Sequence, residues 1–122
     1  MSWTSEEARR VGDATELSLA SRRPDGSLRP YTIMWVARVG DEVFVRSAGG
    51  PDRPWYRNAL AAGTGRIRAG GVEADVTFES VEADADAIDR VYHAKYDRYG
   101  PGPVGAVTGP AARSVTVRLV RP

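Results

Sequence analysis

A glycine-containing junction with three arginines and a serine is the segment of this chain best suited to chemistry. The apolar run 43–45 precedes the junction, and a short helix-forming segment, 54–62, follows it. Glycines allow sharp turns and close approach to a ligand, while the first turn of a helix offers unpaired N–H groups and the positive end of its dipole. The sequence therefore predicts a site for an anionic group such as a phosphate. Its candidate residues are Arg46, Ser47, Gly49, Gly50, Arg53 and Arg57.

Each of these residues also has a purely structural interpretation, and the sequence leaves both open. Arg46 ends an alternating strand, so it is either a phosphate ligand or a solvated or ion-paired arginine. Arg53 and Arg57 lie one helical turn apart and could form a solvent-facing pair. The two glycines could serve the turn alone.

A planar ring would need apolar walls beside such an anion site. Trp55 either anchors the helix to the rest of the fold or walls a ring pocket. Asn58 is the only carboxamide in the chain and either binds a ring edge or braces a loop. Thr32 and Trp35 lie on opposite faces if their strand is regular, so only one of them can face a given pocket.

The helical pattern over residues 84–99 offers a second candidate site. Lys95 lies within an apolar stripe beside Tyr92 and Tyr96, where a cation is costly unless its ammonium reaches water or an anion. The structural interpretation is that Lys95 extends its ammonium to water. The alternative makes these three residues candidate catalytic groups, of which a tyrosine or Lys95 donates a proton to a reduced substrate or contacts a phosphate. Zero cysteines and a single histidine argue against a metal site, and no serine triad can be assembled.

Length and composition limit the classes of protein to consider. The chain has 122 residues, 42% hydrophobic content and a net charge of +1. These values predict one domain over residues 1–122, with an N-terminal helix at 1–13 and the remaining core at 15–122. The near-neutral charge gives no reason to expect nucleic acid, and neither a signal peptide nor a membrane-spanning run is present. A cytoplasmic protein acting on a small molecule is the expectation.

Local patterns predict an α+β fold. Alternating or apolar runs indicate about six antiparallel strands, at 16–21, 28–39, 42–47, 65–69, 72–79 and 114–120. Three helices are expected, near residues 4–11, 54–62 and 84–99. A small sheet of this kind hides its edges best by curling into a barrel. Residues 100–113 are expected to form a loop.

Residues 45–50, 54–58 and 65–67 together resemble the strand-loop-helix-strand core of the FMN-binding split-barrel superfamily, which includes pyridoxamine-phosphate oxidases and especially the deazaflavin-dependent nitroreductases. Adding residues 32–36, 88–96 and 117–119, the chain from about 15 to 122 is most similar to the uncharacterised family catalogued as domain of unknown function 2255.

The resemblance implies a homodimeric split barrel that holds FMN or a deazaflavin and works as an oxidoreductase, passing a hydride between cofactor and substrate. The cofactor-binding residues so implied are Thr32, Trp35, Arg46, Ser47, Gly49, Gly50, Arg53, Trp55, Arg57 and Asn58.

Two family elements are altered in this chain: residues 21–27 replace a Gly-Arg-x-Ser-Gly run, and no lysine precedes Lys95. These departures favour a first alternative, a split barrel that binds a ligand or performs biosynthetic chemistry without a cofactor. A second alternative is a structural dimerisation module.

Overall fold

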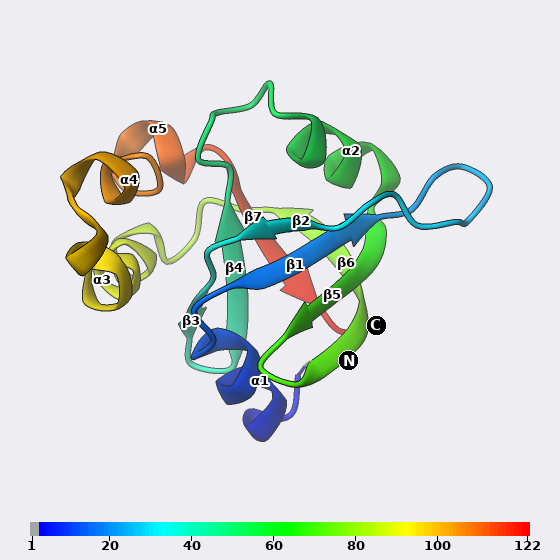
Figure 1. The fold of residues 1–122 in the computed structure, drawn as a ribbon, viewed down its shortest axis with the longest axis horizontal. Helices are drawn as coiled ribbons and strands as arrows, with labels where there is room; N and C mark the ends of the chain where they lie inside the picture. Colours follow the sequence, from blue (N-terminus) through cyan, green and yellow to red (C-terminus); the bar gives the residue numbers. More distant parts are fainter. Residues whose placement is uncertain (1–2) are drawn as a thin grey trace.

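The computed structural model describes residues 3–122, whose strands form one antiparallel sheet that curls into an open barrel (Figure 1). The strand order is β2-β1-β5-β6-β7-β4-β3. The strands are β1 (Leu17–Ser21), β2 (Thr32–Met34), β3 (Ala37–Val39), β4 (Glu42–Arg46), β5 (Thr64–Ala69), β6 (Val72–Ser80) and β7 (Thr116–Val120). The α+β split-barrel prediction is confirmed.

Helices cover the ends and one side of this barrel. They are α1 (Ser5–Gly12), α2 (Pro54–Ala62), α3 (Ala85–Tyr96), the 3-10 helix η1 (Asp97–Tyr99), α4 (Pro101–Gly105) and α5 (Pro110–Arg113). Figure 1 shows α1 and α2 at opposite ends of the sheet and α3, α4 and α5 gathered on one side. Within residues 3–122, no helix combines the length and apolar character needed to cross a membrane.

The first helix begins as its sequence predicts. The backbone N–H of Glu7 donates to Oγ1 of Thr4 at 3.1 Å, and the backbone N–H of Thr4 donates to Oε1 of Glu7 at 3.2 Å. This reciprocal capping box satisfies two donors that a helix start leaves unpaired. The helix then buries Ala8 and Val11 completely against the barrel.

The single long strand expected over residues 28–39 is wrong, because the structure divides it into β2 and β3 at the two edges of the sheet. The backbone N–H of Val36, between them, donates to the hydroxyl of Tyr96 at 3.2 Å instead of to a strand. This contact lets the chain leave β1, the partner of β2, and continue toward β4, the partner of β3. The division accounts for seven strands in residues 3–122 where about six were expected.

The segment expected to be a loop, 100–113, contains α4 and α5. Both helices begin with a proline at the first or second position, where its missing N–H costs no hydrogen bond. The helix before them ends at Tyr96 and continues as η1 to Tyr99. The count of three helices was therefore wrong. The glycine-rich composition of this segment favours a loop, but its prolines are placed where they can begin helices.

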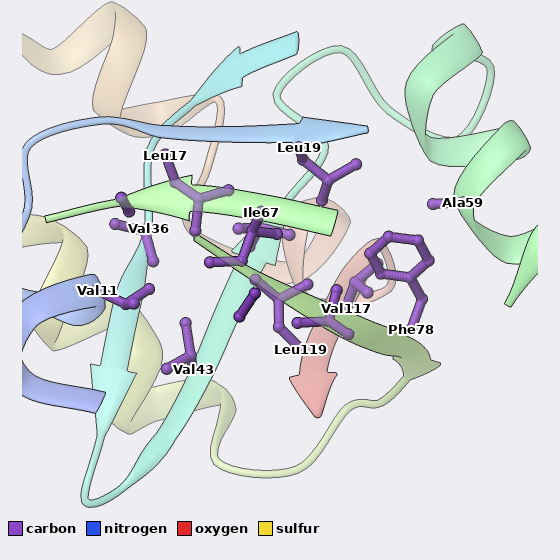
Figure 2. Packing of buried hydrophobic residues seen from close by; sticks show 14 of the residues in the cluster. Val11, Leu17, Leu19, Val36, Val43, Ala59, Ile67, Phe78, Val117 and Leu119 are labelled. Carbon is purple, nitrogen blue, oxygen red and sulfur yellow. The ribbon is translucent and has the colours of Figure 1, made fainter. Parts of the chain in front are cut away.

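Two hydrophobic cores lie on the two sides of the sheet. The larger one fills the barrel, where residues such as Leu17, Val43 and Leu119 meet (Figure 2). The smaller one packs Phe44 of β4 under α3 and α4. Because side chains alternate along a strand, Arg46 points to the same side as Phe44, toward α3. This alternation positions the first of the predicted site residues.

Candidate functional site

A pocket of about 430 Å³ lies between β2, the loop from β4 to α2, and the α4 segment. Its lining is mainly apolar, with three charged residues. The lining residues are Glu16, Ile33, Met34, Trp35, Arg46, Ala48, Gly49, Arg53, Trp55, Pro103, Ala106 and Val107. Five of the predicted cofactor-binding residues are among them: Trp35, Arg46, Gly49, Arg53 and Trp55.

Arg53 is the arginine whose guanidinium stays available at this pocket. It is the residue before α2, exposed, and it forms no ion pair within residues 3–122. Its side chain crosses Gly49 so closely that a Cβ built on Gly49 would lie 1.6 Å from Nε of Arg53. A side chain at position 49 would therefore displace the guanidinium. The helix start beside it adds favourable potential for an anion.

Arg46, in contrast, is held by the protein itself. Its guanidinium forms an ion pair with Asp89 of α3. It also donates from Nε to Oγ1 of Thr116 at 2.9 Å and from Nη1 to the carbonyl oxygen of Val107 at 2.9 Å. Arg46 adjoins the pocket, but its side chain has 0% exposed surface. The ion-pair interpretation thus describes this guanidinium, which is occupied mainly by partners within the protein.

The carboxyl of Asp89 is adapted to this role. Burial by itself would raise its pKa, but hydrogen bonds from Arg46 and Arg113 outweigh burial and hold the pKa below the usual value of 3.8. Arg113 donates to Asp89 at 2.9 Å, and the backbone N–H of Gly109 donates at 3.4 Å. One carboxylate therefore ties β4, α3 and the α5 region together.

Ser47 and Gly50 build the turn rather than the pocket wall. The hydroxyl of Ser47 donates to the carbonyl oxygen of Gly50 at 2.5 Å, and the backbone N–H of Gly50 donates back to the carbonyl oxygen of Ser47 at 3.1 Å. Gly50 has φ +86°, a left-handed conformation that glycine adopts without strain. These two residues shape the loop that carries Gly49 and Arg53.

Three other predicted residues lie outside this pocket. Thr32 lies on β2, where it pairs with Leu19 of β1, and Arg57 is exposed on α2. Asn58 lines a different cavity of about 490 Å³, beside the turn that joins β1 to β2. The structure therefore does not bring these three side chains together with Arg53.

Two tryptophans provide the aromatic lining of the pocket. Trp35 lies between β2 and β3 and stacks on Tyr96 with ring centroids 4.1 Å apart and planes 5° apart. Trp55 opens α2 and packs edge-on against Tyr56 at 5.8 Å. These aromatic contacts restrict the rotation of both indoles, so they act as fixed surfaces against which a planar ring can lie.

The three candidate catalytic residues lie inside the fold and do not line the pocket. Tyr92 is fully buried, and burial raises the pKa of its hydroxyl far above 10.0. Tyr96 donates to the carbonyl oxygen of Thr15 at 2.8 Å, and burial raises its pKa to about 12. Lys95 donates to three backbone carbonyl oxygens, those of Gly12, Ala14 and Val36, at 2.6, 2.8 and 2.8 Å. In this arrangement none of them offers a proton to the pocket.

Lys95 is expected to titrate near pH 8, because burial lowers the pKa of its ammonium from 10.5 to about 8. It is the only lysine in the chain, so ¹³Cε-lysine NMR observes it as a single resonance. The unfolded chain keeps its proton up to pH 10.5, so unfolding takes up a proton between the two pKa values. The contribution of Lys95 to stability therefore increases from pH 8 to 10.5. A midpoint above pH 10 would contradict this assignment.

Sequence reasoning missed two parts of the pocket. Glu16, just before β1, contributes a carboxylate, and the α4 segment contributes Pro103, Ala106 and Val107. The strand register was the available signal for Glu16, since alternation places it on the face opposite to the buried Leu17. No local signal places the α4 segment beside Trp35, because that contact joins residues far apart in the sequence.

Comparison with known proteins identifies the family and the fold. The family model described as "Uncharacterized protein conserved in bacteria (DUF2255)" matches residues 7–119. A search of the curated proteins finds no relative of significant similarity.

Solved structures of similar fold belong to proteins with different tasks. A conserved hypothetical protein from Mycobacterium tuberculosis superposes with a TM-score of 0.65 at 20% identity, over 99% of this chain and 81% of that one. The heme storage protein HutZ from Vibrio cholerae gives 0.62 at 16% identity, over 96% and 87%. An F420-H2 dependent reductase gives 0.62 at 16% identity, over 88% and 94%. These similarities show the fold.

Proposed function

We propose that this chain, which belongs to the DUF2255 family, binds a flavin or deazaflavin in the pocket beside Arg53 and acts as an oxidoreductase on a small organic substrate. The observation that carries the proposal is the unpaired guanidinium of Arg53, held over Gly49 at the start of α2 and next to two fixed indoles. A similar fold in an F420-H2 dependent reductase supports it.

The residues present fit such a cofactor. A pocket of about 430 Å³ is within the usual range of roughly 300–1,000 Å³ for ligand sites. Because Gly49 has no side chain, the guanidinium of Arg53 can lie over it at the edge of the pocket. Trp35 and Trp55 provide apolar surfaces for a ring. Arg53 would hold the phosphate, and the indoles would orient the ring.

The cofactor, when bound, supplies hydride transfer, and the protein supplies the rest. Trp35, Ile33 and Met34 would exclude water from one side of the ring. The network of Arg46 and Asp89 keeps β4 and α3 fixed, so that the loop carrying Arg53 starts from a rigid strand. Because Tyr92, Tyr96 and Lys95 do not line the pocket, the substrate would draw any proton from solvent.

Replacing Arg53 by alanine tests the anion site. We expect wild-type protein to bind FMN more tightly than riboflavin, which lacks the phosphate, and Arg53→Ala to lower FMN affinity about 10- to 100-fold while leaving riboflavin affinity unchanged. Arg57→Ala is the matched control, one turn further along α2 and outside the pocket. Fluorescence titration measures the affinity of wild type, Arg53→Ala and Arg57→Ala for FMN, riboflavin and F420.

Three results would overturn this proposal. Retention of the FMN preference in Arg53→Ala would mean that the phosphate lies elsewhere. A loss in Arg57→Ala equal to that in Arg53→Ala would assign the effect to general charge on α2. If neither FMN nor F420 binds at 100 µM, the cofactor-free alternative replaces the oxidoreductase.

The homodimer stays a prediction, and β2 is the surface available for it. This strand is an edge of the sheet, with unpaired backbone groups on its outer side, and it exposes 63% of Ile33. The same strand borders the pocket. A second copy on this edge would therefore also border the bound ring.

A further inference from the structure

The register of β1 against β2 explains how Glu16 enters the pocket. Leu17 pairs with Met34 and Ser18 pairs with Ile33. Glu16 lies immediately before β1 and Trp35 immediately after β2, so both stand at this end of the ladder. Both line the pocket, while Leu17 is fully buried in the barrel.

The charges of this pocket are unevenly distributed. Arg46 is neutralised by Asp89 and has no exposed side-chain surface. Glu16 and Arg53 form no ion pair within residues 3–122, so they are the two charged groups of the pocket that remain free to meet a ligand. An ionised carboxylate only accepts hydrogen bonds, whereas a guanidinium only donates them.

These two groups come from different elements of the fold. Glu16 immediately precedes β1, and Arg53 immediately precedes α2, at the end of the loop that follows β4. Trp35 and Trp55 line the same pocket. A ligand that fills the pocket therefore meets the acceptor on the β1 side and the donor on the α2 side.

We propose that Glu16 is a specificity-determining residue, which selects aromatic ring systems that present an N–H donor at one edge and an acidic group at the other. This inference rests on the proposed function, because it concerns the same pocket. Flavins and deazaflavins both carry an imide N–H on the pyrimidine edge of the ring and a phosphate on the side chain. Heme has no N–H donor at its rim, so it gains no hydrogen bond with Glu16.

A pair of ring probes without phosphate isolates the effect of Glu16. Lumiflavin has the imide N–H, and 3-methyllumiflavin replaces it with a methyl group. We expect wild-type protein to prefer lumiflavin about tenfold, as a charge-assisted hydrogen bond gives, and Glu16→Ala to reduce this ratio to within about twofold. Glu82→Ala, an exposed carboxylate outside the pocket, is the control and keeps the wild-type ratio. Fluorescence titration measures each ratio.

A second pair keeps the inference testable if flavins do not bind. Tryptamine and tryptophol share an indole and differ in an ammonium against a hydroxyl. Suppose that neither lumiflavin binds, but that wild-type protein prefers tryptamine about tenfold and Glu16→Ala loses this preference. This result would overturn the flavin proposal and support the role of Glu16. Equal ratios in wild type and Glu16→Ala for both pairs would overturn the inference, and so would a preference for 3-methyllumiflavin.

Discussion

Asp89→Asn is expected to lower the free energy of unfolding by about 3 kcal/mol, the low end of the cost of breaking a buried ion pair. The change removes the charge that compensates Arg46, whose side chain has no exposed surface. The remaining partners of Arg46, Thr116 and the carbonyl oxygens of Val107 and Ala85, are neutral. Urea denaturation monitored by tryptophan fluorescence measures the change.

Asp86→Asn is the matched control for this experiment. Asp86 also binds Arg113, at 2.6 Å, but its side chain is 75% exposed against 15% for Asp89. An exposed pair contributes about 0–1 kcal/mol, so the control should unfold almost as wild type does. Equal effects of the two substitutions would mean that Arg46 does not depend on Asp89.

Acid provides a second measurement on the same pair. The pKa of Asp89 in the folded protein lies below 3.8, so its stabilising contribution is fully present above that value and is lost as the pH falls through the folded pKa. The difference in stability between wild type and Asp89→Asn should therefore shrink below pH 3.8. A difference that is constant down to acid unfolding would show that charge is not the cause.

Lys95→Met is expected to lower the free energy of unfolding by about 2 kcal/mol at pH 9, where the buried amine has lost the charge that burial penalises. Methionine fills similar space but donates no hydrogen bond, so the carbonyl oxygens of Gly12, Ala14 and Val36 lose a common donor. These carbonyls belong to the end of α1, the following turn and the break between β2 and β3. The loss should appear as a lower midpoint in thermal and urea unfolding.

Arg90→Met controls for the removal of a cation from α3. Arg90 is exposed on the same helix and forms no ion pair within residues 3–122. Its substitution should change stability by less than about 0.5 kcal/mol, as expected for an exposed surface position. If Lys95→Met is equally mild, its ammonium is dispensable for the fold and returns as a candidate proton donor.

The fold followed from the sequence wherever local signals agreed with the final environment. The helix Pro54–Ala62 and the pairing of residues 42–46 back on 37–39 were predicted, because a proline start and a two-residue turn depend on neighbouring residues alone. The break near Val36 was not predictable, because its cause is the hydroxyl of Tyr96, 60 residues away. A local sequence pattern indicates only the propensity of a segment, so it cannot reveal a contact between residues that are far apart in the sequence.

In the candidate site, too, the sequence indicated the residues Arg46 and Arg53, but the tertiary structure decided their roles. Residue type and spacing made both of them candidate anion ligands and left an ion-paired or solvent-facing interpretation open for each. Whether an arginine stays free depends on which acids the fold brings to it, and only the packing of α3 on β4 brings Asp89 to Arg46. The apolar Phe44 on the same face of β4 was the one sequence signal that Arg46 would lie under a helix.

The sequence by itself determined most of the strands, the first three helices, the family and the turn that carries Gly49 and Arg53, since these depend on capping residues, alternation and glycine conformation. The tertiary structure decided which charges remain available. It buried Arg46 and Lys95 among partners distant in sequence and, within residues 3–122, left Glu16 and Arg53 without an ion-pair partner in one pocket. The physical reason is that the hydrogen-bonding state of a side chain is a property of its surroundings, and folding assembles those surroundings from the whole chain.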